Sequence, residues 1–569
     1  MAVSPLFGVW DYVVVAVVLL ISSMIGIYYR FTGGKQKTVQ EYLLADKNMS
    51  ITPVAFSLMA SFMSAITLLG VSSENYTYGF QFIVINLTYG FFTPVAAYLF
   101  LPIFFKLQAT SAYEYLELRF GKISRLAASL SYTLQMTLYM GIVVYAPALA
   151  LEALTGISKE VAILSIGVVC TFYSTLGGMK AVLMTDVFQS LLMFAAVFSV
   201  IGSAVVNKGS FAEIWRIAEA GRRTELLNFD PDPTVRHSWF TLIIGGGITF
   251  LTLYGVNQTQ VQRYLTISNL KDAQKALWLN WPILSLLSLS TSFAGLCIYS
   301  RYYDCDPVKA NIISNADQLM PYYVVDTMGF IPGLSGLFVA GIFSAALSTV
   351  SAALNSLAAV TVEDYYKPLY RYAFKQDLPS DSSSWQTKLI AFIYGLICVG
   401  VAFLAQFLGG LLQSALTIFG LVGGPLLGLF SLGMFTLTAN ESGSVTGLVS
   451  GIAIAAWMAF GPKPAPTALP TSIDGCETFV NITQTESVQK DDSEYLWINR
   501  VSYLYNGVAG LIITLFVGYI VSYIVRKITG KRVEDEDYDP NLFIPILSRS
   551  LLKNKKQFIE LHEKAEVKA

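Results

Sequence analysis

Long apolar stretches recur along this 569-residue chain, and they restrict it to folds that a lipid bilayer can hold. A helix that crosses a bilayer needs about 17 to 25 mostly apolar residues, because its backbone must satisfy its own hydrogen bonds there. Thirteen stretches approach or exceed that length, at residues 9–29, 50–72, 79–105, 126–151, 159–176, 181–206, 238–262, 276–300, 329–362, 389–408, 411–438, 444–461 and 502–525. Only 13% of the residues are charged, whereas about 25% is typical of soluble proteins. The sequence therefore predicts an all-α, polytopic membrane protein.

Basic residues predict how the spans are oriented. They follow the first, third and last spans, as Arg30, Lys35, Lys37, Lys47, Lys106, Arg119, Lys122, Arg125, Arg526, Lys527, Lys531 and Arg532. Short loops rich in Lys and Arg stay on the cytoplasmic side. We therefore expect an extracellular N-terminus, a transmembrane domain over residues 1–530, a cytoplasmic tail over residues 531–569, and a place in the plasma membrane. The first span has no basic segment before it and no cleavage pattern, so we expect it to be retained.

The same orientation places residues 462–500 in an extracellular loop. Asn481 begins an Asn-Ile-Thr sequence in that loop, which is an acceptor for N-glycosylation. Cys305 and Cys476 are the two cysteines expected in extracellular loops. An oxidising compartment would allow a disulfide between them, although their positions in the sequence do not show that they approach each other.

Composition limits the chemistry that this chain can perform. A net charge of −1 gives no indication of a nucleic-acid partner, and the only histidines in the sequence are His237 and His562. The five cysteines do not follow a metal-ligand spacing. The expected spans also lack paired catalytic carboxylates, so we do not expect an enzyme.

A hydroxyl-rich stretch at residues 341–355 lies inside the ninth expected span. At helical spacing Ser344, Ser348 and Ser351 share one face, with Thr349 beside them. Hydroxyls and freed carbonyls are oxygen ligands that can replace the hydration shell of a small cation. The same small residues also suit close packing between helices, and this stretch alone does not decide between the two interpretations.

Two other spans carry signs of interruption. The second span mixes small, hydroxyl and apolar residues at 57–67, and the seventh contains Gly245, Gly246 and Gly247. Glycine within a helix costs about 1 kcal/mol relative to alanine, so three in a row favour either unwinding or very close packing. With the leading helix set aside, these spans occupy equivalent places in two five-helix halves. That arrangement is typical of transporters built from inverted repeats.

Asp186 follows the Gly177–Gly178 turn and enters the sixth expected span. A carboxylate inside a membrane is costly and usually has a function and a partner. The alternative is an aspartate near a helix N-terminus, where the helix dipole and nearby water stabilise it.

Four motifs in order resemble those of the sodium/solute symporters. They are SLMASFMSA in the second span, GGMKAVLMTD at 177–186, NQTQVQRYL at 257–265 and SAALSTVSAALNS at 344–356. The resemblance extends over residues 8–530. It implies thirteen transmembrane helices, with a five-plus-five inverted-repeat core of the LeuT type, one leading helix and two trailing helices. It also implies alternating access driven by sodium, the coupling ion.

The resemblance also implies a sodium site between the second and ninth spans. In the family pattern, backbone carbonyls of Ala60, Met63 and Ala345 coordinate the ion together with the hydroxyls of Ser348 and Thr349. Five neutral oxygens would hold sodium moderately, which suits an ion that must leave again.

Some members of this family hold another sodium nearer the cytoplasm. Asp186, Ser348 and Ser351 match that second site. Ala352 stands where a hydroxyl is usual, which weakens the match.

The substrate class follows from the branch that the chain resembles. Sugar-transporting members have a glutamate where this chain has Gln81, whereas residues 57–70, 139–151 and 423–430 resemble the branch of iodide, multivitamin and monocarboxylate symporters. Thr67 stands where iodide carriers have glutamine, as in the monocarboxylate members. The resemblance then implies a substrate pocket containing Ser64, Thr67, Tyr89, Tyr145, Tyr254 and Phe419. Each of the aromatic residues could instead serve only in core packing.

These observations predict a sodium-coupled symporter that imports a small organic anion such as lactate, pyruvate or nicotinate. The alternatives are a transporter of biotin, pantothenate or iodide, and a non-transporting sensor on the same scaffold. No Arg or Lys lies deep in any expected span. We therefore expect half-helix N-termini, hydroxyls and the bound sodium to hold the anion.

Overall fold

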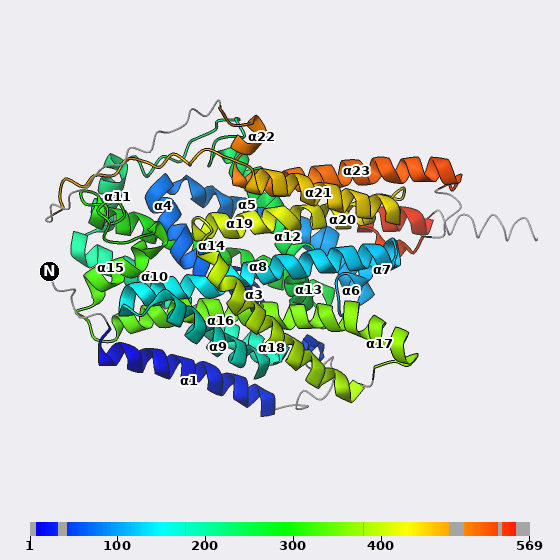
Figure 1. Cartoon of the computed structure of the whole chain (residues 1–569), viewed down its shortest axis with the longest axis horizontal. Coiled ribbons are helices and arrows are strands. Elements are labelled where there is room, and N and C mark those ends of the chain that lie inside the picture. The colour runs from blue at the N-terminus through cyan, green and yellow to red at the C-terminus, as the bar shows by residue number, and fades with distance from the viewer. Residues whose placement is uncertain are drawn as a thin grey trace, which may run out of the picture.

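The computed structural model describes residues 7–31, 43–176, 178–378, 380–476, 494–532 and 538–553. Every regular element in these residues is helical, and most of the long helices lie along one axis (Figure 1). Within the described residues, ten helices are long and apolar enough to cross a membrane, or eleven if one bent pair counts as a single span. The all-α membrane architecture is therefore confirmed, whereas the expected count of thirteen is not.

The spans are built from single helices or from stacked segments. Single helices are α1 (Val9–Phe31), α8 (Lys122–Thr155), α10 (Met179–Lys208), α14 (Leu270–Tyr302), α16 (Leu334–Val360), α18 (Ser380–Ala405), α21 (Glu441–Phe460) and α23 (Asn506–Thr529). The third expected span consists of η3 (Phe80–Val84), α5 (Ile85–Val95), η4 (Ala96–Phe100) and α6 (Leu101–Leu107). The eleventh consists of α19 (Leu411–Ile418), η8 (Phe419–Gly423) and α20 (Gly424–Phe435).

Shorter helices cap the two ends of the bundle. They are α7 (Glu114–Arg119), α11 (Phe211–Ala220), α15 (Leu319–Met328), α17 (Lys367–Phe374) and α22 (Trp497–Arg500), with the 3-10 turns η1 (Ala45–Lys47), η6 (Ala316–Gln318), η10 (Tyr503–Tyr505) and η12 (Pro540–Leu542). The segment η7 (Thr361–Tyr366) joins α16 to α17. Figure 1 shows α11 and α15 at the end of the bundle near the N-terminus, and α7 and α17 at the opposite end.

Two of the thirteen expected spans do not appear even among the eleven. Residues 159–176 form α9 (Lys159–Leu176), which has 18 residues. Residues 238–262 form η5 (Thr241–Gly245), α12 (Gly246–Tyr254) and α13 (Gln258–Tyr264). The apolar helix there ends at Tyr254, so it is too short to be counted as a membrane span.

The second expected span is broken, as its mixed composition predicts. It consists of α3 (Ile51–Phe62), and then η2 (Thr67–Val71) and α4 (Ser72–Tyr78), with a bend of 64° between the two halves. Met63 has extended backbone angles, which end the first half. The hydroxyl of Ser64 accepts a hydrogen bond from the Ile66 N–H at 3.2 Å, so a local side chain satisfies one donor in the break.

The triple glycine of the seventh span remains helical, and close packing is the reason for it. A Cβ atom on Gly246 would lie 2.8 Å from Ile85 Cγ1, and one on Gly247 would lie 2.2 Å from the Phe92 ring. The interruption comes later, at residues 255–257. There Asn257 caps α13 by accepting the N–H of Thr259 at 2.9 Å.

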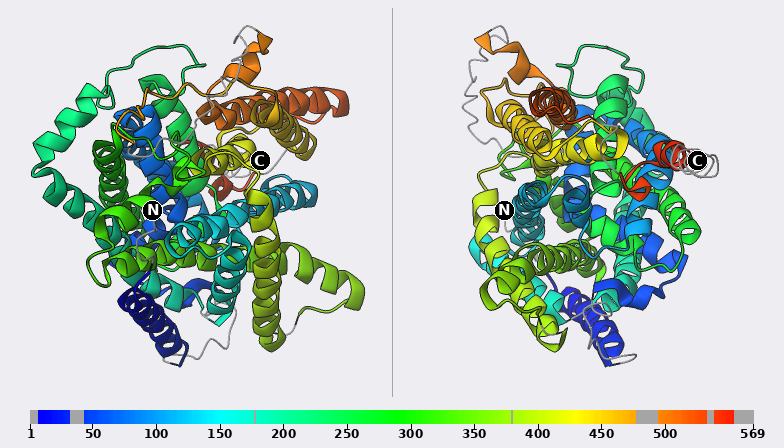
Figure 2. Two further views of the ribbon diagram at one scale, coloured as in Figure 1. Left: turned by 60° about the vertical axis from the view of Figure 1, so that its left-hand side comes forward. Right: turned by 90° about the vertical axis from the view of Figure 1, so that its right-hand side faces the viewer.

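α16 lies at the centre of the bundle. It packs against α10, α8, α3, α9 and α1, and nearly all of its residues from Phe338 to Val360 are buried. By contrast, α1 and α23 expose most of their apolar surface and lie at the periphery in both views of Figure 2. The hydroxyl-rich helix is therefore the axis of the core, and the leading and last helices lie outside it.

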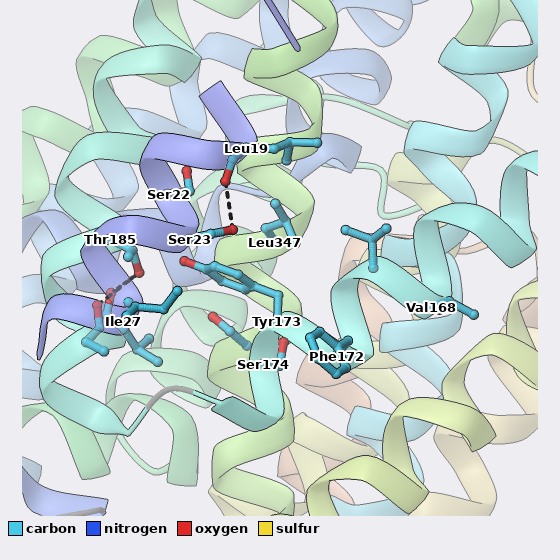
Figure 3. Close-up of a pocket in the computed structure, with 15 residues that line it drawn as sticks. Leu19, Ser22, Ser23, Ile27, Val168, Phe172, Tyr173, Ser174, Thr185 and Leu347 are labelled. Carbon is cyan, nitrogen blue, oxygen red and sulfur yellow. Dashed lines mark hydrogen bonds between the residues drawn. The ribbon is translucent and has the colours of Figure 1, made fainter. Parts of the chain in front are cut away.

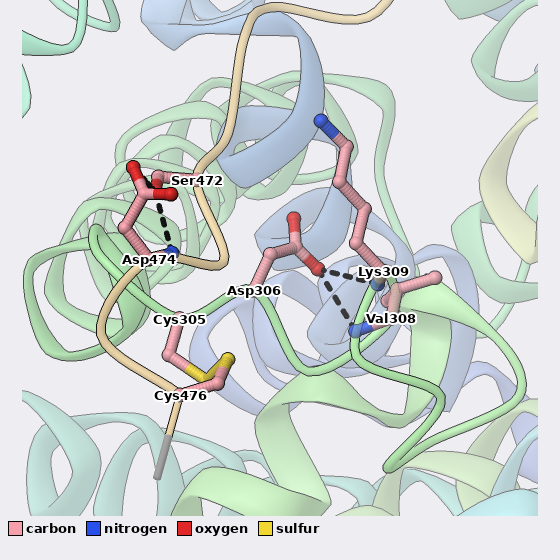
Figure 4. Close-up of a disulfide and its surroundings, with 7 residues drawn as sticks. All are labelled: Cys305, Asp306, Val308, Lys309, Ser472, Asp474 and Cys476. Atoms are coloured by element: carbon pink, nitrogen blue, oxygen red, sulfur yellow. Dashed lines mark hydrogen bonds between the residues drawn. A yellow bond between two sulfur atoms is a disulfide. The ribbon is translucent and has the colours of Figure 1, made fainter. Parts of the chain in front are cut away.

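A disulfide ties together two loops at one end of the bundle. It joins Cys305 to Cys476, with the two Cα atoms 5.0 Å apart (Figure 4). Backbone hydrogen bonds flank it: Asp306 N donates to Ser472 O, and Gly475 N to Asp304 O, both at 2.9 Å. Asn481, the expected glycosylation site, lies outside the described residues.

Part of the expected cytoplasmic tail packs onto the bundle. Leu542, Phe543 and Ile544 are buried. The Ile544 N–H donates to Met434 O at 3.2 Å, and the Tyr115 hydroxyl donates to Leu542 O at 3.1 Å. The segment after residue 538 therefore covers the end of the bundle where α7 and α20 meet.

Candidate sodium and substrate site

The end of α3 and the middle of α16 bring several oxygen atoms together. The Thr349 hydroxyl lies 3.3 Å from Ala60 O and 3.1 Å from Ala345 O, within hydrogen-bonding distance of both. Ala60 belongs to the last turn of α3, where carbonyls have no partner in a continuing helix. Three of the five expected sodium ligands therefore form one group of oxygens, and the break in the second span makes a carbonyl available to it.

The other two expected ligands are close to this group in the sequence, Met63 three residues after Ala60 and Ser348 directly before Thr349. Met63 lies in the break, and its N–H donates to Met59 O at 2.8 Å. Ser348 is buried on α16 and donates its hydroxyl hydrogen to Asp186 Oδ1 at 2.6 Å. Because that hydrogen is directed at the carboxylate, the lone pairs of the Ser348 oxygen are free to face a cation.

Asp186 is fully buried and has three partners. Besides Ser348, its carboxylate accepts a short hydrogen bond from the Ser57 hydroxyl. The guanidinium of Arg263 lies 3.6 Å from Asp186 Oδ2, and both side chains have no exposed surface. A buried carboxylate needs a charge partner as well as hydrogen bonds, and this arrangement provides both.

Arg263 is the functional residue that the analysis of the spans missed. It lies in α13, one position after the expected seventh span, within the motif NQTQVQRYL. Its Nε donates to Ser57 Oγ and its Nη1 to Thr259 O, both at 2.8 Å. Arg263 lies outside the expected spans, so the analysis of the spans did not consider it; the chain turns inward after the break at 255–257 and buries this arginine.

The residues assigned to a second sodium are linked through Ser348, whose hydroxyl donates to Asp186. Ser351 donates to Ser348 O at 3.0 Å, and its side chain lines a separate cavity of about 480 Å³ between α1, α9, α10 and α16. Figure 3 shows that cavity, with Tyr173 and Thr185 on its wall and Ser23 donating to Leu19 O at 2.8 Å. Its lining is mostly apolar.

The helix break also borders a small cavity of about 40 Å³. Four of the six expected pocket residues line it, namely Ser64, Thr67, Tyr89 and Phe419. Other lining residues are Phe62, Met63, Tyr139, Ser288 and Leu412. A space of this size admits only a few water molecules, so the pocket is closed in this conformation.

Tyr139, which was not among the expected pocket residues, lies at the cavity, whereas the expected Tyr254 does not. Tyr139 lines the cavity, and its hydroxyl lies 3.4 Å from Ser64 Oγ. Tyr254 does not line it, but donates to Leu58 O at 3.2 Å and so supports α3 just before the break. Tyr145 is buried elsewhere on α8. The motif at 139–151 begins with Tyr139, which was the available signal.

Comparison with known proteins identifies the family. The model of the Sodium:solute symporter family matches residues 42–451. The chain belongs to the sodium:solute symporter family. It is therefore a sodium-coupled solute symporter, a multi-pass membrane protein and not an enzyme, and sodium is its coupling ion.

Two relatives show which transporters of the family this chain is similar to. A Drosophila melanogaster protein named "Putative sodium-dependent multivitamin transporter" is 55% identical over 557 residues, covering 96% of this chain and 92% of that protein. The human sodium-coupled monocarboxylate transporter 1 is 47% identical over 538 residues, covering 91% and 87%. The symporter is thus similar over nearly its full length to both kinds of carrier.

Solved structures show the same architecture. A sodium-coupled sialic acid symporter in a substrate-bound outward-open state matches with a TM-score of 0.74 and 26% identity, covering 91% of this chain and 98% of that one. A nucleobase-cation-symport-1 family transporter in a closed conformation matches with a TM-score of 0.52 and 12% identity, covering 87% and 96%. The second likeness shows the fold alone, which is the LeuT type that the resemblance to the sodium/solute symporters implied.

Proposed function

We propose that this symporter couples sodium entry to the uptake of a small organic monocarboxylate. One observation carries the proposal: Met63 and Ser64 are consecutive residues of the helix break, and the first belongs to the proposed sodium ligands while the second lines the cavity. An anion in the cavity would then lie beside the cation. Each ion would stabilise the other in a site from which water is largely excluded.

The cavity is suited to a substrate with one negative charge. Of the described residues that line it, none is Lys or Arg, and Ser64, Thr67, Tyr89, Tyr139 and Ser288 provide hydroxyl groups. The second half of the broken helix begins beside the cavity at Thr67, so the positive end of its dipole faces an anion there. Sodium would supply the remaining positive charge, which makes anion binding depend on the ion.

A carboxylate on a larger vitamin is the second candidate. The 55% identity to a Drosophila protein with a multivitamin name favours it. The 47% identity to the human sodium-coupled monocarboxylate transporter 1 favours a smaller body such as lactate or nicotinate. Both candidates share the carboxylate, so the same sodium-linked mechanism applies to either.

We also propose that the N-terminus faces the outside of the plasma membrane and the tail after residue 530 faces the cytoplasm. The disulfide between Cys305 and Cys476 supports this orientation, because disulfides persist in oxidising compartments. Helix α7, which carries Arg119 after the third span, lies at the opposite end of the bundle (Figure 1).

Uptake by purified protein in proteoliposomes tests the proposal. Lactate, nicotinate, biotin, iodide and glucose are supplied in parallel, with and without an inward sodium gradient. We expect sodium-driven uptake of lactate or nicotinate, with at least a tenfold loss in the double variant S348A/T349A. Ser199→Ala is the matched control, because that hydroxyl bonds only within α10 to Ala196 O in the described structure.

Other results of the uptake experiment would change the proposal. Preference for biotin would assign the vitamin branch, and preference for iodide would remove the carboxylate from the proposal. If sodium binds and none of these solutes accumulates, the monocarboxylate proposal is wrong, and a non-transporting sensor becomes the better account. If S348A/T349A lowers uptake without changing its sodium dependence, these two hydroxyls are not sodium ligands.

A further inference from the structure

A partly buried arginine joins two helices above the closed cavity. Arg236 precedes η5, and its Nε and Nη2 donate to the two carboxylate oxygens of Glu74 on α4 at 2.7 and 3.0 Å. Its Nη1 donates to Gln413 Oε1 on α19 at 2.8 Å. We call these three residues the outer latch. It connects the second half of the broken helix to α19 through one guanidinium group.

Aromatic rings hold the guanidinium of the outer latch in place. Its carbon lies 4.0 Å from the ring centroid of Tyr78 and 4.9 Å from that of Tyr503. The side chains of Arg236 and Glu74 are 18% and 7% exposed. A two-pronged arginine–carboxylate pair of this kind is strong and directional when it is largely shielded from water.

The latch lies over the path into the cavity. Leu412 lines the cavity and immediately precedes Gln413. A Cβ atom added to Gly70 would lie 2.9 Å from Leu412 Cβ, so the broken helix and α19 touch just beneath the latch. Separating these two segments is therefore necessary for a solute to pass between them.

The outer side of the latch is a basic vestibule. A cavity of about 460 Å³ there includes Arg236 and Gln413 in its lining. Among the described residues that line it, Arg222, Arg236, Lys463 and Arg500 carry positive charge, Glu225 carries negative charge, and His237 is also present. An excess of positive charge in a concave site raises the local concentration of anions.

We propose that the outer latch is the extracellular gate, and that the carboxylate of the incoming substrate opens it by replacing Glu74 on Arg236. The proposal rests on the anionic substrate and the orientation proposed above. A guanidinium fork matches one carboxylate at a time, and an incoming carboxylate has the same geometry as Glu74. Once displaced, Glu74 would be buried without its charge partner, so α4 would move outward into water.

Labelling of a cysteine beneath the latch tests this proposal in the full-length protein. The variant Leu412→Cys is treated from the outside with a membrane-impermeant thiol reagent in a sodium-containing medium. Lactate is added in one sample and its uncharged analogue lactamide in another. The native free cysteines Cys170, Cys297 and Cys398 are buried, so they give a low background. We expect lactate to raise the labelling rate several-fold and lactamide to leave it unchanged.

Variants of the latch separate the gate from the proposed function. Glu74→Gln should raise labelling several-fold in sodium without any substrate, and lactate should add little. Glu213→Gln, which breaks an exposed ion pair with Arg216, is the matched control and should behave like the parent. Arg236→Lys retains the charge without the fork and should show an intermediate basal rate.

Labelling in the absence of substrate still tests the gate if lactate is not transported. A failure to transport lactate would contradict only the proposed function. If the labelling rate in sodium without substrate is the same with and without Glu74→Gln, the outer latch is not the gate. If Glu74→Gln raises labelling but lactate and lactamide act alike, the opening by carboxylate exchange is wrong. Arg236→Lys and a measurement of surface expression guard against a variant that fails to fold.

Discussion

Ser348 on α16 donates its hydroxyl hydrogen to Asp186 on α10 across 2.6 Å, inside a bundle where neither side chain is exposed. Ser348 is a proposed sodium ligand, so the carboxylate orients a group that would touch the ion. Asp186 is therefore a positioning residue for the proposed sodium site, whether or not it binds a second ion.

Asp186→Asn should weaken sodium binding more than it lowers the maximal rate. The amide lacks the charge that orients the Ser348 hydroxyl, and a hydrogen bond to a charged group is worth about 1.5 to 3 kcal/mol. We expect the sodium concentration for half-maximal uptake to rise about tenfold or more. Sodium-activation curves measure it, and Ser199→Ala should change the value by less than about twofold, because its hydroxyl bonds within α10 to Ala196 O.

Arg263→Met should destabilise the fold because it leaves Asp186 buried without a charge partner. Breaking one member of a buried pair costs about 3 to 5 kcal/mol. The double variant R263M/D186N removes both charges and should recover much of that loss. Thermal unfolding in detergent measures the stability of each variant. If the stability losses of the two single variants add up in the double variant, the two residues act independently.

Gly247→Ala should destabilise the contact between α12 and α5. A Cβ atom at this position would lie 2.2 Å from the Phe92 ring, so the two helices would have to separate. We expect a loss of about 1 to 3 kcal/mol. Gly202→Ala on α10 is the control, because a Cβ atom there meets no atom within 4 Å and alanine favours the helix. Equal unfolding temperatures for the two variants would contradict the packing explanation.

Asp317 should make the outer gate sensitive to external pH. Its carboxylate accepts the Leu411 N–H at 2.8 Å and the Ser73 hydroxyl at 3.0 Å, which adds a second link between α4 and α19. Burial raises the pKa of Asp317 to about 6, and the nearby Glu74 adds to the increase, while the Leu411 N–H and the Ser73 hydroxyl oppose it.

Opening would expose this carboxyl to water and lower its pKa. The closed state therefore binds the proton more tightly and becomes favoured as pH falls through about 6, whereas ionisation above that pH disfavours closure. We expect the labelling rate of Leu412→Cys, relative to the same cysteine with Asp317→Asn, to fall several-fold from about pH 7.5 to about pH 5.5. That ratio cancels the titration of the thiol itself. A ratio that does not vary with pH would contradict the role of Asp317.

Local sequence determined the parts of this protein that depend on near neighbours. The apolar stretches predicted the membrane helices because each crossing must satisfy its own backbone. The small and hydroxyl residues at 57–67 predicted the break that frees Ala60 O, since helix continuity is a local property. The hydroxyls of 344–351 predicted the face of α16, and Asp186 was identified because a carboxylate in an apolar stretch requires a partner.

Only the tertiary structure decided which residues meet. Ser57 and Asp186 are 129 positions apart, and Glu74 and Arg236 are 162 apart, so no local pattern pairs them. Whether the triple glycine unwinds or packs depended on Phe92 and Ile85 of another span. Arg263 was missed for the same reason: its burial follows from the direction of the chain after a break, and an inward turn buries the charge only because Asp186 lies there to offset its desolvation.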